Sequence, residues 1–217
     1  MAERTRPDGS AGQPRRNTRA ALDAFLSEMI EDPERRDEIM PKVEDVFGQE
    51  RAVMVLDMSG FSRTTKTQGI VPFLLMIHQM KLVVQPALGA HGGVLIKAEA
   101  DNLFCLFDSV AQAVAASRET TERLSVVNLL LPEARRLYVS IGIGFGRVLN
   151  IEDQEVFGDE VNVASKLGED VAGMGQILLT VAAAASIAEP GQDIVIVSSA
   201  ELPADVIDTA MLDKNGP

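Results

Sequence analysis

The chain has 217 residues, of which 46% are hydrophobic and 24% are charged, enough for one globular domain with a full core and some additional length. Its formal net charge of −12 argues against a general nucleic-acid binder or a membrane-surface protein, because both need a basic surface. The single cysteine, Cys105, allows no internal disulfide and is typical of a cytoplasmic protein, and no apolar run of about 18 residues predicts a membrane-spanning helix.

The first 47 residues divide into a tail and a short helical segment. Residues 1–18 are rich in Arg, Gly, Pro and Ser and are expected to form a disordered tail. Residues 19–47 are predicted to form two short helices, punctuated by Pro33 and Pro41, because apolar residues recur at helical spacing: Leu22, Phe25, Leu26, Met29 and Ile30. This segment is expected to support dimerisation or coupling, or else to form a helical lid on the main domain.

Residues 48–197 show the alternation of strands and helices of a mixed α/β domain. The expected elements are, in chain order, a strand (51–57), a helix (69–90), two strands within 92–107 with a tight turn near residues 100–102, a helix (108–130), a long strand (136–149), a helix (159–171), a strand (176–180), a short helix (181–188) and a last strand (193–197). Residues 198–217 are acidic and are expected to be a C-terminal tail.

The core order strand–helix–strand–strand–helix–strand is the βαββαβ plan of ferredoxin-like folds, with a mostly antiparallel sheet. In this plan the third strand lies antiparallel beside the first, so the turn before the third strand lies next to the end of the first. Asp57 ends the first strand and Asp101 lies in that turn, so the two carboxylates are expected to meet. Such a pair suits Mg²⁺ or Mn²⁺, although Asp57 alone is equally explained as a cap of the following turn or helix.

Three motifs in this order resemble those of the class III nucleotidyl cyclases, over about residues 51–188. DMSGFS (57–62) resembles the family motif D-x-x-G-F-[ST], and KAEAD (97–101) resembles K-x-x-G-D. EVFGDEVNVASK (155–166) resembles D-x-x-G-x-x-V-N-x-A-x-R. The resemblance implies the cyclase homology fold and an adenylate cyclase, which converts ATP to 3′,5′-cyclic AMP and pyrophosphate.

The resemblance also implies how the metal ions and the phosphates are bound. Asp57 and Asp101 are implied to hold two Mg²⁺ or Mn²⁺ ions per site. The backbone that follows the first strand is expected to offer N–H groups to the β- and γ-phosphates, from Met58, Ser59, Gly60 and Phe61. The glycine run at residues 142–146 lacks the strand–turn–helix setting of a phosphate loop and is interpreted as a strand that allows close packing.

Four further residues are implied to bind the nucleoside. Lys97 donates hydrogen bonds and ionised Glu155 accepts them, which fits the edge of adenine better than that of guanine and favours ATP over GTP. Asn162 is implied to orient the ribose, and Lys166, four residues later on the same helix face, to stabilise the transition state. The structural alternatives are a surface ion pair between Lys97 and Glu99, and ordinary turn and helix roles for Glu155 and Asn162.

The sequence departs from the family pattern at three positions. Ala100 stands where the family usually has Gly, and Ala is strained there if the turn needs a positive φ. Lys166 replaces an Arg and lacks its planar fork, and Glu155 replaces an Asp. The substitutions at Ala100 and Lys166 motivate the alternative of a weak or inactive cyclase-homology domain that senses nucleotide or binds a protein. Guanylate cyclase and diguanylate cyclase activities are less favoured, because Lys97 is not an acid and no GG[DE]EF motif is present.

In this family the metal-binding acids come from one subunit and the base-reading and transition-state residues from the other. This chain carries both sets, so the resemblance implies a homodimer with two composite sites. A regulatory protein partner is expected to act through the N-terminal helices or the tails. No nucleic-acid or membrane partner is expected.

Overall fold

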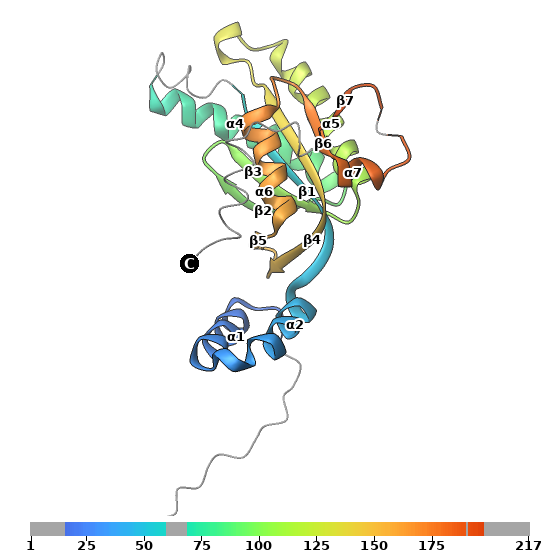
Figure 1. Ribbon diagram of the computed structural model, residues 1–217. Helices are drawn as coiled ribbons and strands as arrows, with labels where there is room; N and C mark the ends of the chain where they lie inside the picture. Colours follow the sequence, from blue (N-terminus) through green and yellow to red (C-terminus); the bar gives the residue numbers. More distant parts are fainter. Residues whose placement is uncertain (1–15, 60–68, 190, 198–217) are drawn as a thin grey trace, which may run out of the picture. The chain divides into compact units, whose positions relative to one another are not determined.

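The computed structural model describes residues 16–59, 69–189 and 191–197. The chain separates into two compact units, Met1–Phe47 and Gly48–Pro217, which are described individually (Figure 1).

The N-terminal unit contains the two short helices that the apolar spacing predicts. Helix α1 (Arg19–Glu31) begins after Thr18, whose hydroxyl accepts the N–H of Ala21, and the short 3₁₀ turn η1 (Pro33–Arg35) leads into α2 (Arg36–Phe47). The rings of Phe25 and Phe47 meet edge to face with their centroids 6.5 Å apart. Pro41 lies inside α2 and does not end a helix as the sequence analysis expected. Buried Ile39 and Val43 lie on either side of it within the helix.

The second unit is built on a seven-stranded sheet with the order β2-β3-β1-β4-β6-β7, and β5 pairs with β4. The pairs β1–β3, β1–β4, β2–β3 and β4–β5 are antiparallel, whereas β6 pairs in parallel with β4 and with β7. The strands are β1 (Gly48–Met58), β2 (Val94–Glu99), β3 (Asn102–Phe107), β4 (Val139–Ile151), β5 (Glu155–Phe157), β6 (Ile177–Thr180) and β7 (Ile194–Val197). This order confirms the predicted ferredoxin-like βαββαβ core; β5 was not predicted.

Helices cover both faces of this sheet (Figure 1). They are α4 (Ile70–Ala90), α5 (Val110–Asn128), α6 (Asp159–Lys166) and α7 (Val181–Ala185), with a 3₁₀ turn η2 (Glu133–Arg135) and a π-helical turn η3 (Leu167–Val171) directly after α6. On β1, Met54 packs with α4 and α5, whereas Val53 and Val55 pack with α6. Because side chains alternate along a strand, Asp57 lies on the α6 face of the sheet.

Glycines on β4 let α6 pack directly against the sheet. A Cβ atom at Gly142 would overlap the carbonyl oxygen of Ala164, and one at Gly144 would lie 2.7 Å from the Glu160 carboxylate. Gly168 makes the reciprocal approach from η3, because its Cβ would lie 2.7 Å from the carbonyl oxygen of Val55. The structure confirms that the glycine run at residues 142–146 serves close packing.

Helix α4 is long and apolar enough to cross a membrane, judged by its length and composition alone. No such helix was expected from the sequence. One side of α4 packs in the core through residues that include Phe73, Met80 and Val84, while Val71 and Leu75 are exposed. Core helices of soluble proteins pass the same test, so α4 is weak support for a membrane span.

We predict that Gly142→Ala destabilises the protein by about 1–3 kcal/mol, because the new methyl group overlaps the backbone of α6. Urea denaturation followed by circular dichroism measures the change. Gly89→Ala in α4 is the matched control, since a Cβ there meets nothing within 4 Å and alanine favours a helix. Equal stability of Gly142→Ala and the wild type would contradict the close packing of α6.

Candidate active site

Two strand pairings bring Asp57 and the Asp101 turn to the same end of the sheet. In the β1–β3 pair Leu56 lies opposite Leu103, and in the β2–β3 pair Glu99 lies opposite Asn102. The turn that contains Asp101 therefore lies beside the last residues of β1. Asp57 and Asp101 are both partly buried, and the charge of Asp101 acts on Asp57.

Burial and neighbouring acids make this end of the sheet unfavourable for negative charge. Burial is the main reason that the pKa of Asp57 rises to about 7; the charges of Asp101 and Glu169, and to a smaller extent Asp170, add to the rise, and the backbone N–H of Met58 opposes it. Burial also raises the pKa of Asp101. A bound cation would relieve this repulsion.

The donor set of this site fits a metal ion that shares its ligands with a substrate. Among the described residues, no group of three or more His, Cys, Asp or Glu side chains is arranged to hold a metal ion by itself. The candidate protein ligands are therefore the two carboxylates of Asp57 and Asp101. Mg²⁺ is commonly bound in this way, by one or two carboxylates together with phosphate oxygens and water.

Ala100 adopts the strained, positive-φ conformation that its position in the turn suggested. Its φ is +49°, in the left-handed region that favours glycine. The strain lies directly before Asp101, in the turn that positions that carboxylate.

The backbone after β1 already has partners. The N–H of Ser59 donates to the carbonyl oxygen of Tyr138 at 2.9 Å, and the hydroxyls of Ser59 and Ser140 lie 2.7 Å apart. The N–H of Met58 hydrogen-bonds Asp57. Ser59 and Met58 thus do not present free N–H groups to phosphate here, and the other two residues of the expected phosphate loop, Gly60 and Phe61, lie outside the described residues.

Lys97 lies on the α6 face of the sheet and is held there by two contacts. Its ammonium lies 3.2 Å from a carboxylate oxygen of Glu99 and 4.2 Å from the centre of the Phe104 ring. Phe104 belongs to the same apolar cluster as Val53 and Val55. The surface ion pair with Glu99, which was the structural alternative for Lys97, is present.

The remaining predicted residues lie on β5 and α6. Glu155 begins β5, which contacts the strand of Lys97, so the two expected base-reading residues come from neighbouring strands. Asn162 is exposed on α6, and the Lys166 ammonium at the end of that helix lies 3.0 Å from Asp170. No direct contact joins Asn162 or Lys166 to Asp57 or Asp101 among the interactions of the described residues.

Sequence reasoning missed two acids close to the predicted pair. Glu169 and Asp170, in η3, lie near enough to Asp57 to raise its pKa. The available signal was their spacing, since both follow Lys166 within four residues and directly follow Gly168.

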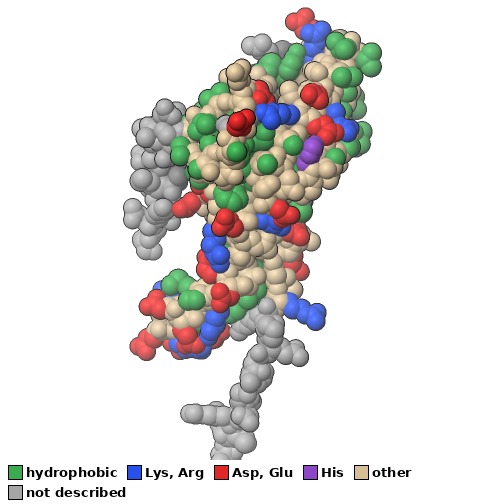
Figure 2. All heavy atoms as spheres, turned by 90° about the vertical axis from the view of Figure 1, so that its right-hand side faces the viewer, with side chains coloured by type: hydrophobic (Ala, Val, Ile, Leu, Met, Phe, Trp, Pro, Cys, Tyr) green, Lys and Arg blue, Asp and Glu red, His purple; other side chains and the backbone are tan. Residues whose placement is uncertain are grey.

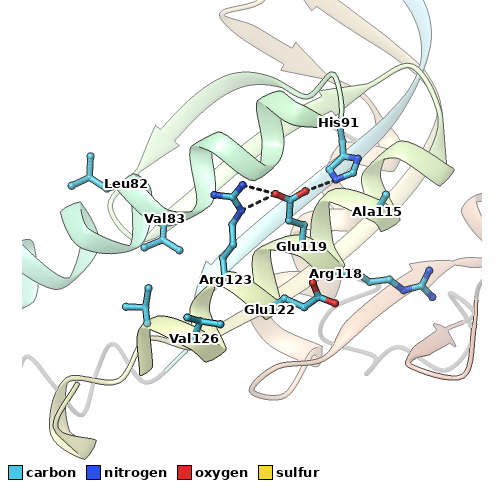
Figure 3. Close-up of a pocket in the computed structure, with 10 residues that line it drawn as sticks. Leu82, Val83, His91, Ala115, Arg118, Glu119, Glu122, Arg123 and Val126 are labelled. Carbon is cyan, nitrogen blue, oxygen red and sulfur yellow. Dashed lines mark hydrogen bonds and ion pairs between the residues drawn. The ribbon is translucent and has the colours of Figure 1, made fainter. Parts of the chain in front are cut away.

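A hollow of about 1000 Å³ lies elsewhere, between α4 and α5 (Figure 3). Its polar side is a chain of contacts in which His91 lies 2.8 Å from Glu119, and Glu119 lies 2.6 Å from Arg123. The hollow shares no lining residue with the carboxylate pair. Figure 2 shows acidic and basic side chains intermixed on the face that it draws, rather than a broad basic patch, in line with the net charge of −12.

Comparison with curated proteins gives two matches, whereas no family model matches the chain. The chain is 29% identical over 116 residues to a Rhizobium meliloti (strain 1021) protein named "Putative adenylate cyclase 3". It is 29% identical over 132 residues to the Myxococcus xanthus protein named "Serine/threonine-protein kinase pkn2". These matches cover 54% and 61% of the chain but only 20% and 16% of the relatives' own lengths.

Solved structures of cyclase catalytic domains share the fold. An adenylate/guanylate cyclase/hydrolase from Silicibacter pomeroyi is 28% identical, with a TM-score of 0.50 over 60% of this chain and 74% of that one. The guanylyl cyclase Cya2 is 21% identical, with a TM-score of 0.57 over 65% of this chain and 80% of that one. The monomeric guanylyl cyclase domain of RhoGC from Blastocladiella emersonii is 14% identical, with a TM-score of 0.58 over 65% of this chain and 88% of that one. The latter two show the fold alone.

The raised pKa of Asp57 predicts a pH-dependent loss of stability without metal. Between the unfolded pKa of 3.8 and the folded value of about 7, the folded state holds a proton that the unfolded state releases. Stability is therefore expected to fall as the pH rises through this window. Asp57→Asn should remove this fall and be more stable than the wild type at pH 8, with little difference at pH 4.

Denaturant unfolding of both proteins at a series of pH values, in chelator, tests this expectation. Glu122→Gln, at an exposed position of α5, is the control for removal of one acid. Parallel pH profiles for Asp57→Asn and the wild type would refute the electrostatic account of Asp57.

Ala100→Gly is expected to stabilise the protein by about 0.5–1 kcal/mol, because glycine adopts the positive φ of the turn without a clash. Ala98→Gly in the adjacent strand β2 is the matched control and should destabilise by a similar amount, since glycine weakens an extended strand. Thermal unfolding distinguishes the two. Destabilisation by both changes would show that the turn carries no strain.

Proposed function

Because the chain resembles the class III nucleotidyl cyclase catalytic domain in both sequence and fold, we propose that it is an adenylate cyclase that converts ATP to 3′,5′-cyclic AMP and pyrophosphate. The single observation that carries the proposal is the convergence of Asp57 and Asp101 at one end of the sheet, in surroundings that disfavour their negative charge.

In the proposed reaction the 3′-hydroxyl of ATP attacks the α-phosphorus and expels pyrophosphate. Two Mg²⁺ or Mn²⁺ ions per site, when bound, supply positive charge that activates the hydroxyl and stabilises the leaving group. Asp57 and Asp101 are the proposed ligands. The backbone from Met58 to Phe61 remains a proposed phosphate contact, although Ser59 would first have to release its N–H from Tyr138.

Adenine recognition is proposed for Lys97 and Glu155. The Lys97 ammonium donates to the acceptor nitrogen of adenine, and the Glu155 carboxylate accepts from the exocyclic amine. The curated relative named as an adenylate cyclase supports ATP, whereas the solved neighbours include guanylyl cyclases. The pairing of Lys97 with Glu99 is exposed and weak, so exchanging it for the base costs little.

The ribose and the developing phosphate charge are proposed to meet α6. Asn162 orients the ribose, and the Lys166 ammonium, one turn later, approaches the α-phosphate as its negative charge grows. As the family resemblance implies, Asn162 and Lys166 of one subunit are proposed to act with Asp57 and Asp101 of the other. The functional unit is thus a cytoplasmic homodimer with two composite sites, whose geometry a protein partner adjusts through the N-terminal helices or the tails.

A second candidate is a weakly active or inactive nucleotide-sensing or protein-binding domain. Two features favour it: the positive φ of Ala100 strains the turn of Asp101, and Lys166 stands where the family pattern has an arginine. Both features would weaken catalysis before they weakened nucleotide binding.

Incubation of the purified protein with ATP or GTP, with Mg²⁺ and then Mn²⁺, tests the proposal. We expect cyclic AMP from ATP, and a loss of about 100-fold or more in Asp57→Asn and in Asp101→Asn, because each removes a metal ligand. Glu122→Gln is the matched control and should retain full activity. Cyclic GMP as the main product would contradict the base assignment, and nucleotide binding without turnover would favour the second candidate.

A further inference from the structure

The two acids of the π-helical turn η3 are both tied back to the last turn of α6. Ser165 donates a hydrogen bond to the Glu169 carboxylate, and the Lys166 ammonium donates to Asp170 at 3.0 Å. Each acid thus holds one side chain that lies four residues before it. Two neighbouring acids, Glu169 and Asp170, thus pair with two neighbouring residues of α6.

The position of η3 in the fold is fixed by the backbone. A Cβ atom on Gly168 would lie 2.7 Å from the carbonyl oxygen of Val55 and 3.1 Å from the N atom of Gly142, so this turn lies directly on β1 and β4. Val55 precedes Asp57 by two residues on the same face of β1. The backbone two residues before Asp170 is therefore packed against the strand that ends at the proposed metal ligand, and the exposed Asp170 carboxylate pairs with the Lys166 ammonium.

A lysine at this position needs such an anchor more than an arginine would. The lysine ammonium is a point charge on a flexible stem, and fixing that stem costs rotamer entropy. An arginine reaches phosphate through a planar, preorganised fork. Helix stability alone does not account for the pair, because an acid that follows a lysine by four residues is the weaker order in a helix.

We propose that Asp170 is a positioning residue for Lys166, which holds the lysine ammonium in place so that it meets the developing charge on the phosphate without a costly search of rotamers. The inference rests on the proposed function and deepens it. Asp170 itself touches neither substrate nor metal. Its effect passes through Lys166 alone and should appear in the chemical step rather than in substrate binding.

Asp170→Asn is expected to lower kcat for cyclic AMP formation by about 5- to 20-fold and to leave KM within about twofold, because a misplaced group costs rate before it costs affinity. Glu169→Gln is the matched control. It removes the same charge from the same turn, near the same Asp57, but does not contact Lys166, so its kcat should stay within about twofold of the wild type.

Rescue separates positioning from a general structural effect. In a Lys166→Arg background the guanidinium fork supplies its own geometry, so adding Asp170→Asn should change kcat by less than about twofold. An unchanged or raised kcat in Asp170→Asn alone would overturn the inference. So would an equal loss of kcat in both the lysine and the arginine backgrounds.

A measurement that needs no turnover distinguishes failure of this inference from failure of the proposed function. In ¹³Cε-lysine NMR, the Lys166 side chain should become more mobile in Asp170→Asn and stay unchanged in Glu169→Gln. Unchanged mobility in Asp170→Asn overturns the inference even if the enzyme is active. Increased mobility in a protein that turns over neither ATP nor GTP overturns the proposed function but leaves Asp170 as the residue that positions Lys166.

Discussion

The close contact of α6 and η3 with the central strands is the constraint on which the candidate site depends. Gly142 on β4 and Gly168 in η3 lack the side chains that would separate the two layers, so backbone lies against backbone. This contact sets the distance of Lys166 and Asp170 from β1. It also covers part of the face on which Asp57 lies, and burial is the main reason that the pKa of this acid is high. The same packing thus sets the position of Lys166 and contributes to the high pKa of Asp57.

Topology explains why much of the fold and the meeting of Asp57 with Asp101 could be predicted from the sequence. The alternation of apolar runs gave the βαββαβ order, and that order has few ways to pair its strands. Once β3 lies beside β1, the turn before β3 must reach the end of β1. The positive φ considered for Ala100 is also present, because a two-residue turn between antiparallel strands commonly needs one. The roles of the individual site residues stay predictions.

Features that depend on local backbone detail could not be predicted. Strand β5 is three residues long and has no periodic pattern of its own, so only its pairing with β4 defines it. The π-helical turn has the apolar spacing of an ordinary helix end, so its apolar pattern did not indicate that the charges of Glu169 and Asp170 act on Asp57. The hydrogen bond of Ser59 to Tyr138 likewise depends on the exact register of β1 with β4.

The tyrosine that accepts this hydrogen bond is also an intrinsic fluorophore of the protein. The chain contains no tryptophan and a single tyrosine, so its intrinsic fluorescence under ultraviolet excitation comes from Tyr138. The carbonyl oxygen of this residue accepts the N–H of Ser59, where the chain leaves β1 toward the expected phosphate contacts. A spectroscopist who follows the emission of the unlabelled protein therefore observes one known position, at the edge of the sheet where the nucleotide is proposed to bind.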